Sequence, residues 1–311
     1  YLKMGNPPDP LVACGDGLFL GAITDWRNSD YSRSDTEAKG VLEDGVSINN
    51  GTTYLPLTDG RRNDLHDRLL VTVSPDFHDL LPNIPNPPSP NLDETARYMY
   101  VMSSGPNPNL WRIMKRHGLD DLIAMHFAGI WWRMAGEGFS MRNRPRPEMT
   151  LQELSEYRDY VRGLGFVYGI LMEYGDFFPL NEFWDPNLLS LTPEGAWRTR
   201  WIGHYATKPI ALAHLARVNG ERLQANCGLE AVYLDTHTNH GLNALDYEAG
   251  VPGAGKAAAE ALAVGEMLLE ARRLHGITCS EGIYRWLYAG LVDLDYATWV
   301  GPKGSPWQEP I

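Results

Sequence analysis

Two stretches, Ala231-Val232-Tyr233-Leu234-Asp235 and Ile277-Thr278-Cys279-Ser280-Glu281, decide the fold that this sequence predicts. Each is a short apolar segment that leads to a carboxylic acid. Between them, residues 255–276 place small and apolar side chains at helical spacing and end in Arg272-Arg273-Leu274-His275-Gly276. Cations in the last turn with glycine just beyond are typical of a helix C-terminus. The pattern predicts a strand, a helix and a second strand parallel to the first.

The same unit recurs upstream. A helix from Leu110 ends at Gly118, and the apolar residues 122–125 lead to His126. Thr150-Leu151-Gln152-Glu153 is a capping box that begins the next helix, after which residues 166–172 lead to Glu173. With residues 98–102 and 291–292, the sequence predicts about six parallel strands, whereas a closed (β/α)8 barrel needs eight. We therefore expect an α/β fold with an incomplete (β/α)8-type (TIM) barrel, in a chain that is a fragment of a longer protein.

The first third of the sequence has a different pattern. Short β-prone segments at residues 18–26, 41–48, 52–57 and 69–73 are separated by turn signals such as Asn49-Asn50-Gly51, which predicts antiparallel strands and part of a β-sandwich. Residues 81–90 contain five prolines, and this composition is typical of a linker. The expected domains are a partial β-sandwich-like domain at 1–80, a linker at 81–97 and a barrel at 98–311.

Composition excludes several classes of protein. The 311 residues carry a formal net charge of −12, from 27 basic and 39 acidic residues, which disfavours nucleic acid as a partner. No apolar run reaches the roughly 18 residues of a membrane helix. The three cysteines, Cys14, Cys227 and Cys279, fit no zinc or disulfide pattern, so we expect buried free thiols. The sequence leaves the oligomeric state and the compartment open.

Polar residues follow the predicted strands where parallel barrels place their active sites. They are His126, Glu173, Asp235 and Glu281, with Asp176 and His237 just beyond. Aromatic side chains occupy the same loops: Trp131 and Trp132 follow His126, and Trp286 follows Glu281. Flat rings pack against sugar faces, so acids and aromatics together favour a carbohydrate substrate. We expect the residues other than Asp235 and Glu281 to bind the substrate, and we expect no cofactor.

Glycosidic cleavage needs one carboxylate and one carboxylic acid. Asp235 and Glu281 are one strand-helix-strand step apart, which places them on neighbouring strands at the short separation of a retaining pair. The short Asp235 suits a nucleophile, and Glu281 near Trp286 suits an acid whose pKa is raised by loss of solvent. The sequence thus predicts a retaining glycoside hydrolase acting on an α-linked sugar.

Short motifs around these two acids also resemble a known family. Tyr233-Leu234-Asp235-Thr236 and Ser280-Glu281-Gly282, together with residues 287–293, resemble retaining α-glycosidases of the endo-α-N-acetylgalactosaminidase type and related bacterial (β/α)-barrel glycoside hydrolases. The resemblance spans roughly residues 69–296. It implies a β-sandwich joined to a barrel, with Asp235 as the nucleophile and Glu281 as the acid/base.

Three alternatives compete with the prediction of a glycoside hydrolase. Residues 250–256 fit the phosphate-binding G-x-x-x-x-G-K pattern, but Ala257 replaces the hydroxyl residue that holds magnesium, which argues against nucleotide binding. Asp235, His237 and His240 form a plausible ligand set for a metal-dependent hydrolase. A catalytically silent carbohydrate-binding barrel is the third alternative, because a fold does not fix a function.

Overall fold

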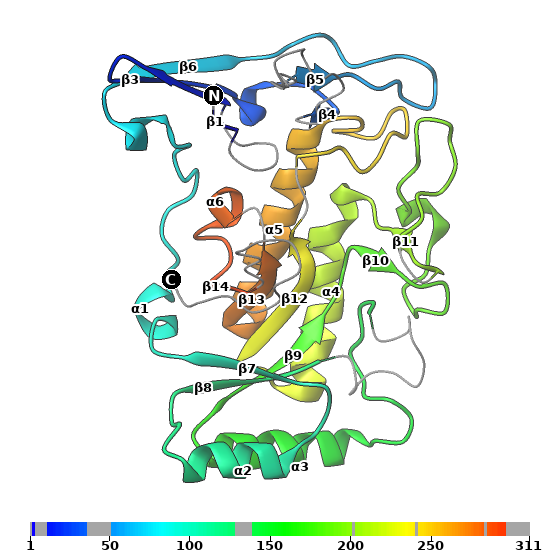
Figure 1. The fold of residues 1–311 in the computed structure, drawn as a ribbon. Coiled ribbons are helices and arrows are strands. Elements are labelled where there is room, and N and C mark those ends of the chain that lie inside the picture. Colours follow the sequence, from blue (N-terminus) through cyan, green and yellow to red (C-terminus); the bar gives the residue numbers. More distant parts are fainter. Residues whose placement is uncertain are drawn as a thin grey trace.

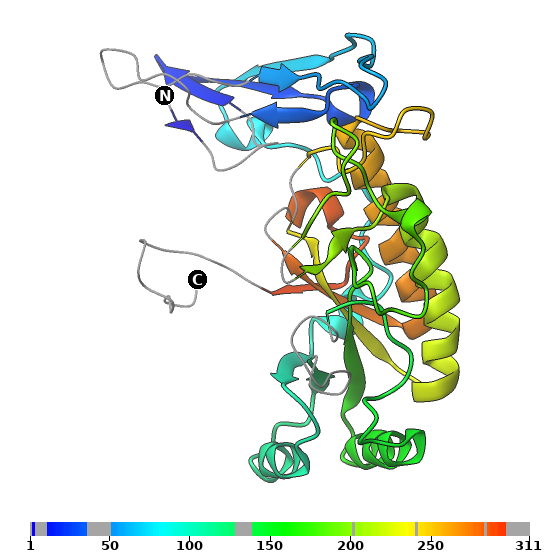
Figure 2. The ribbon, with the colours of Figure 1, turned by 90° about the vertical axis from the view of Figure 1, so that its right-hand side faces the viewer.

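The computed structural model describes residues 2–3, 11–35, 51–127, 139–200, 203–239, 242–282 and 285–296. Its centre is a sheet of six parallel strands that curls into half a barrel (Figures 1 and 2). The strands are β7 (Met99–Ser103), β8 (Leu122–His126), β9 (Val167–Met172), β12 (Ala231–Thr238), β13 (Ile277–Gly282) and β14 (Leu294–Tyr296). They lie in the order β14-β13-β12-β9-β8-β7, and every neighbouring pair is parallel. The predicted incomplete (β/α) barrel with six strands is confirmed in this form.

The connecting helices lie on one side of this sheet (Figure 2). They are α2 (Pro108–Arg116), α3 (Leu151–Gly163), α4 (Pro209–Cys227) and α5 (Ala257–His275), and two single-turn helices, α1 (Leu92–Thr95) and α6 (Arg285–Tyr288), flank the ends of the sheet. Helix α3 begins with the predicted capping box, because Thr150 Oγ1 accepts a hydrogen bond from the Glu153 N–H while the Glu153 carboxylate accepts one from the Thr150 N–H. Helix α4 ends at Gly228, whose φ of 56° is in the left-handed region.

Alternation along the strands separates two cores. Leu122, Ala124, Ile170, Met172, Val232 and Leu234 pack with helix residues such as Trp111 and Leu268. The residues between them form a second cluster on the face away from the helices: Ile123, Met125, Leu171, Ala231, Tyr233, Ile277 and Cys279. Because side chains alternate with a period of two, every strand residue can be assigned to the helix side or to the barrel side. The side on which a strand-end residue lies determines which other residues it can share a site with.

The first third of the chain forms antiparallel sheets above the helices (Figure 1). One sheet has the order β1-β2-β3-β6, made of β1 (Leu2–Lys3), β2 (Leu11–Gly15), β3 (Leu18–Thr24) and β6 (Leu69–Ser74), and β4 (Arg33–Asp35) pairs with β5 (Gly51–Thr53). The expected strands at 18–26 and 69–73 are present, the one at 52–57 is reduced to β5, and the segment 41–48 lies outside the described residues. The β-sandwich stays a prediction. Cys14 is exposed, against expectation, whereas Cys227 and Cys279 are buried, and all three are free thiols.

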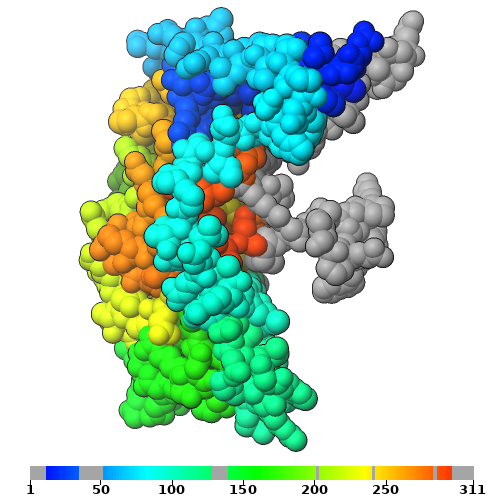
Figure 3. Space-filling model, turned by 90° about the vertical axis from the view of Figure 1, so that its left-hand side faces the viewer, coloured from blue at the N-terminus to red at the C-terminus, as the bar shows by residue number. Residues whose placement is uncertain are grey.

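The proline-rich stretch is firmly attached to the barrel. Residues 81–90 form no helix or strand, and Figure 3 shows them (cyan) running down the surface beside the orange and red C-terminal part. The Asp293 carboxylate holds this segment: it accepts hydrogen bonds from Ser89 and Asn91, pairs with Arg272 at 3.0 Å and accepts from the Thr278 N–H at 2.7 Å. A linker held by a buried ion pair is fixed relative to the barrel.

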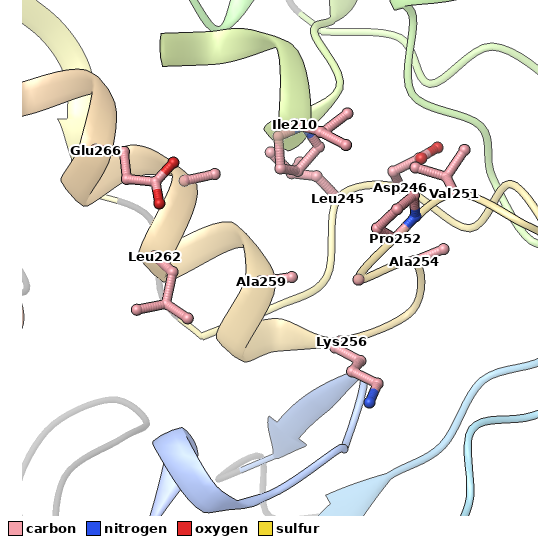
Figure 4. Close-up of a pocket in the computed structure, with 13 residues that line it drawn as sticks. Ile210, Leu245, Asp246, Val251, Pro252, Ala254, Lys256, Ala259, Leu262 and Glu266 are labelled. Carbon is pink, nitrogen blue, oxygen red and sulfur yellow. The ribbon is translucent and has the colours of Figure 1, made fainter. Parts of the chain in front are cut away.

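The first sheets also contact the barrel through the loop before α5. This loop contains the sequence that resembles a phosphate-binding motif, and it lines a cavity of about 300 Å³ (Figure 4). Lys256 Nζ forms an ion pair with Asp30 at 2.8 Å, and the cavity wall includes the acids Asp246 and Glu266. The loop therefore joins the two parts of the chain, and its lysine is already paired. None of the helices in the described ranges has the length and apolar character needed to cross a membrane.

Candidate active site

Three acids extend the barrel-side rows of the sheet. Glu173, Asp235 and Glu281 lie two residues beyond the barrel-side residues Leu171, Tyr233 and Cys279. Glu173 directly follows β9, and the other two lie in the C-terminal halves of β12 and β13. Leu234 pairs with Ser280, and Asp235 and Glu281 are the next residues on these adjacent strands, where the regular pairing ends. They are close enough for the charge of Glu281 to act on the Asp235 carboxyl. Parallel strands thus bring together carboxylates that are far apart in sequence.

Glu173 is the most enclosed of the three, at 1% exposure. Its Oε1 accepts hydrogen bonds from the N–H groups of Gly175 and Asp176, at 2.5 and 3.1 Å, and its Oε2 accepts from Thr236 Oγ1 at 3.0 Å. Burial, followed by the charges of Asp176 and Asp235, raises its pKa well above the ordinary value. A Cβ at Gly175 would lie 2.9 Å from Glu173 Oε1, so any larger residue here would require the Glu173 carboxylate to shift.

Asp235 is 9% exposed, and its Oδ1 accepts a hydrogen bond of 2.8 Å from the Tyr233 hydroxyl. Burial raises its pKa to about 6, the Tyr233 hydrogen bond opposes that rise, and the Glu281 charge adds to it. Glu281 is more open. Burial raises its pKa too, and Asn239 Nδ2 donates to its Oε2 at 3.0 Å. The pair combines an enclosed carboxylate with an accessible carboxylic acid.

The backbone is strained next to Asp235. Thr236 has φ of 59°, a left-handed conformation that a β-branched residue rarely adopts. Leu234 pairs with Ser280, and the next pair is Thr238 with Gly282. Three residues of β12, 235–237, therefore lie opposite the single residue Glu281 of β13, which is a bulge. This bulge directs the Thr236 hydroxyl to Glu173. Strain of this kind is concentrated at functional sites.

Asp176 and His237 lie in the same cluster, as the sequence predicts. Asp176 is 2% exposed and forms an ion pair with Arg200 Nε, which brings a cation among the acids. His237 is equally buried; its Nε2 accepts from the Tyr174 N–H at 3.2 Å and lies 3.4 Å from Glu173 Oε1. The site therefore contains acids and an opposing cation within one buried network.

Two of the predicted residues lie elsewhere. His126 has the parity of Leu122 and Ala124, so it faces the helices: it is fully buried, stacks on Trp111 with ring centroids 5.8 Å apart and contacts Tyr157. The prediction that His126 opens onto the acids is wrong. Trp286 packs against the helix-side core, so its contact with a sugar stays a prediction. Trp131, Trp132 and His240 lie outside the described residues.

The structure adds residues that the sequence did not single out: Tyr233, Thr236, Asn239 and Arg200. The first three lie within six residues of Asp235, whereas Arg200 comes from a separate loop. As for metal binding, no group of three or more His, Cys, Asp or Glu side chains in the described ranges is placed to hold an ion. The acids are instead arranged with hydrogen-bond donors around them.

Three solved structures share the fold of this chain. Alpha-N-acetylgalactosaminidase NagBb from Bifidobacterium bifidum matches with a TM-score of 0.64 and 15% identity in its quadruple mutant, covering 94% of this chain and 55% of that one. Its ligand-free form matches with a TM-score of 0.62 and 16% identity, covering 94% of this chain and 56% of that one. The GH36 alpha-galactosidase AgaA from Geobacillus stearothermophilus matches with a TM-score of 0.53 and 11% identity, covering 91% of this chain and 44% of that one.

At these identities the matches show a shared fold. This chain spans about half the length of the solved structures that it matches. No protein-family model matches the sequence, and no curated protein matches it.

Proposed function

We propose that this chain carries the catalytic site of a retaining α-glycosidase that acts on an α-linked galactose or N-acetylgalactosamine residue. The observation that carries the proposal is the adjacent pair Asp235 and Glu281 on one face of a parallel half-barrel. The sugar class follows from the neighbouring structures, an α-N-acetylgalactosaminidase and an α-galactosidase. Active sites of parallel barrels lie at the C-terminal ends of the strands, which supports the proposal.

The proposed roles of Asp235 and Glu281 follow from how deeply each carboxyl group is buried. Above its pKa of about 6, Asp235 is ionised and can attack the anomeric carbon, which forms a glycosyl-enzyme bond as the bond to the departing oxygen breaks. Glu281, more open and with a raised pKa, gives its proton to that oxygen. In the second step Glu281 takes a proton from water, which attacks the same carbon and releases Asp235. Glu173, Asp176 and His237 would hold sugar hydroxyls.

The test is hydrolysis of aryl α-galactosides and aryl α-N-acetylgalactosaminides, with proton NMR of the first sugar released. An α-anomer as the first product supports retention, and a β-anomer overturns it. An aryl glycoside of a disaccharide that ends in N-acetylgalactosamine distinguishes the two modes of cleavage, because an endo-acting enzyme releases the disaccharide intact. No hydrolysis of any glycoside, with sugar binding retained, would favour the silent binding barrel.

A further inference from the structure

A second cavity, of about 420 Å³, lies at the ends of β7 and β8. It is lined by the turn at residues 103–107, by Phe127 and by Arg146. Phe127 belongs to the barrel-side cluster, and its ring centroid is 6.5 Å from that of Tyr233, which donates to Asp235. Through Phe127 the cavity therefore borders the barrel-side cluster that contains Tyr233.

The charge of this cavity is unusual for so acidic a chain. Among the described residues, its lining contains one cation, Arg146, and no acid, although the chain carries 39 acidic residues against 27 basic ones. Arg146 is half-buried, and within the described residues its Nε has no hydrogen-bond partner and its guanidinium no ion pair. A partly desolvated cation without a counter-charge is unfavourable, and an anion in the cavity would remove that cost.

The remaining walls suit an oxyanion as well. Ser103 and Ser104 bring hydroxyl groups, although that of Ser103 also donates to the Gly105 carbonyl at 2.8 Å. Asn107 is the N-cap of α2, so the positive end of this helix borders the cavity. Phe127 supplies an apolar surface that can pack on a sugar ring. The lining thus combines a cation, hydroxyl donors and one flat ring.

We propose that this cavity binds a negatively charged substituent of the glycan, a sulfate ester or the carboxylate of an acidic sugar, next to the bond that is cleaved. The inference rests on the proposed function and extends it by naming a substrate class, because a neutral glycan offers Arg146 no counter-charge. An arginine that forms two parallel hydrogen bonds with an oxyanion discriminates by roughly 10- to 100-fold against a neutral group.

Binding is measured first, without turnover, by ligand-observed NMR with galactose 6-sulfate, N-acetylneuraminic acid and galactose. The wild type should bind one or both charged sugars at least about tenfold more tightly than galactose. Arg146→Gln should remove this difference, and Arg146→Lys should keep part of it. Arg144→Gln is the matched control, because Arg144 is exposed and lies two residues away. Equal binding of all three sugars by the wild type, or an equal loss in Arg144→Gln, overturns the proposal.

Kinetics separate this inference from the proposed function. Arg146→Gln should leave hydrolysis of a neutral aryl α-glycoside unchanged and raise KM only for the sulfated or acidic substrate. A wild type that cleaves no glycoside would end the proposed function, yet the binding measurement would still decide the role of Arg146. A melting temperature equal to that of the wild type shows that the variant is folded.

Discussion

The Tyr233 hydroxyl donates a hydrogen bond of 2.8 Å to Oδ1 of Asp235, two residues farther along the same strand. The bond stabilises the ionised carboxylate and so opposes the rise in pKa caused by burial. Tyr233 thereby lowers the pH above which the proposed nucleophile is charged. Under the proposed function, Tyr233 would therefore help to set the pH range in which Asp235 is active.

The pH dependence of activity follows from this contact. Asp235 must be ionised to attack, so kcat/KM should fall as pH drops through about 6. Tyr233→Phe removes a donor to the charged form, raises the pKa of Asp235 and should move the acidic limb upward by about one pH unit. The measurement is a kcat/KM profile from about pH 4 to about pH 9. Tyr168→Phe, a buried tyrosine on the helix side, is the control and should leave the limb in place.

Loss of the nucleophile should affect all substrates alike. Asp235→Asn keeps the shape of the side chain but cannot form a glycosyl-enzyme, so turnover should drop by more than about a thousandfold for good and poor leaving groups. A melting temperature near that of the wild type checks the fold. Added azide should give the β-glycosyl azide, because it attacks from the side that the carboxylate occupied. Substantial turnover by this variant would rule out Asp235 as the nucleophile.

Loss of the acid should depend on the leaving group. Glu281→Gln should slow substrates with poor leaving groups by about 10²- to 10⁴-fold and dinitrophenyl glycosides far less, since the latter need little protonation. Azide should accelerate this variant and yield the α-glycosyl azide. Glu266→Gln, on the exposed side of α5, is the matched control. A uniform decrease for all leaving groups, or none, would contradict the acid/base role.

His126 tests the division of the sheet into two faces. It is fully buried among rings, burial lowers its pKa to about 3, and within the described residues neither ring nitrogen has a hydrogen-bond partner. His126→Phe should therefore raise the free energy of unfolding by about 1 kcal/mol and leave KM unchanged. Denaturant unfolding and steady-state kinetics measure the two effects. A severalfold change in KM would mean that the residue does reach the substrate.

Glu260 gives a test of stability that does not involve catalysis. This carboxyl on α5 is 4% exposed, and burial raises its pKa from 4.5 to about 8. A raised acid pKa favours folding most below the ordinary value, and this contribution is lost as pH rises through the raised one. Glu260→Gln should therefore match the wild type in melting temperature near pH 4.5 and exceed it about one pH unit above the raised pKa. Equal melting temperatures at the higher pH would contradict the buried charge.

The repeated unit made the fold predictable. Glycine stops, basic last turns and short apolar runs are local signals, and they predicted five of the six parallel strands in place and the acids near the ends of three of them. The sixth strand was expected at residues 291–292, whereas β14 is Leu294–Tyr296. The face of each strand was not predictable in the same way. Leu122-Ile123-Ala124-Met125 is apolar throughout because a covered parallel strand is buried on both sides, so nothing in it shows that His126 faces the helices.

The rest of the site depends on contacts that sequence cannot specify. Arg200 reaches Asp176 from a loop 24 residues away, and only the folded chain brings them together. Thr236 is a favourable residue for a strand, so its left-handed backbone contradicts its own propensity. Conflicts of this kind between local preference and the final fold are expected at working sites.

The strained backbone at Thr236 has a consequence for protein engineering. The substitution Thr236→Gly would relax the left-handed turn and increase heat resistance, but it would also remove the hydroxyl that donates to Glu173. Screening a library only for survival at high temperature should therefore enrich Thr236→Gly at the expense of catalysis, whereas screening for turnover should restore threonine. Under the proposed function, we expect position 236 to trade heat resistance against turnover.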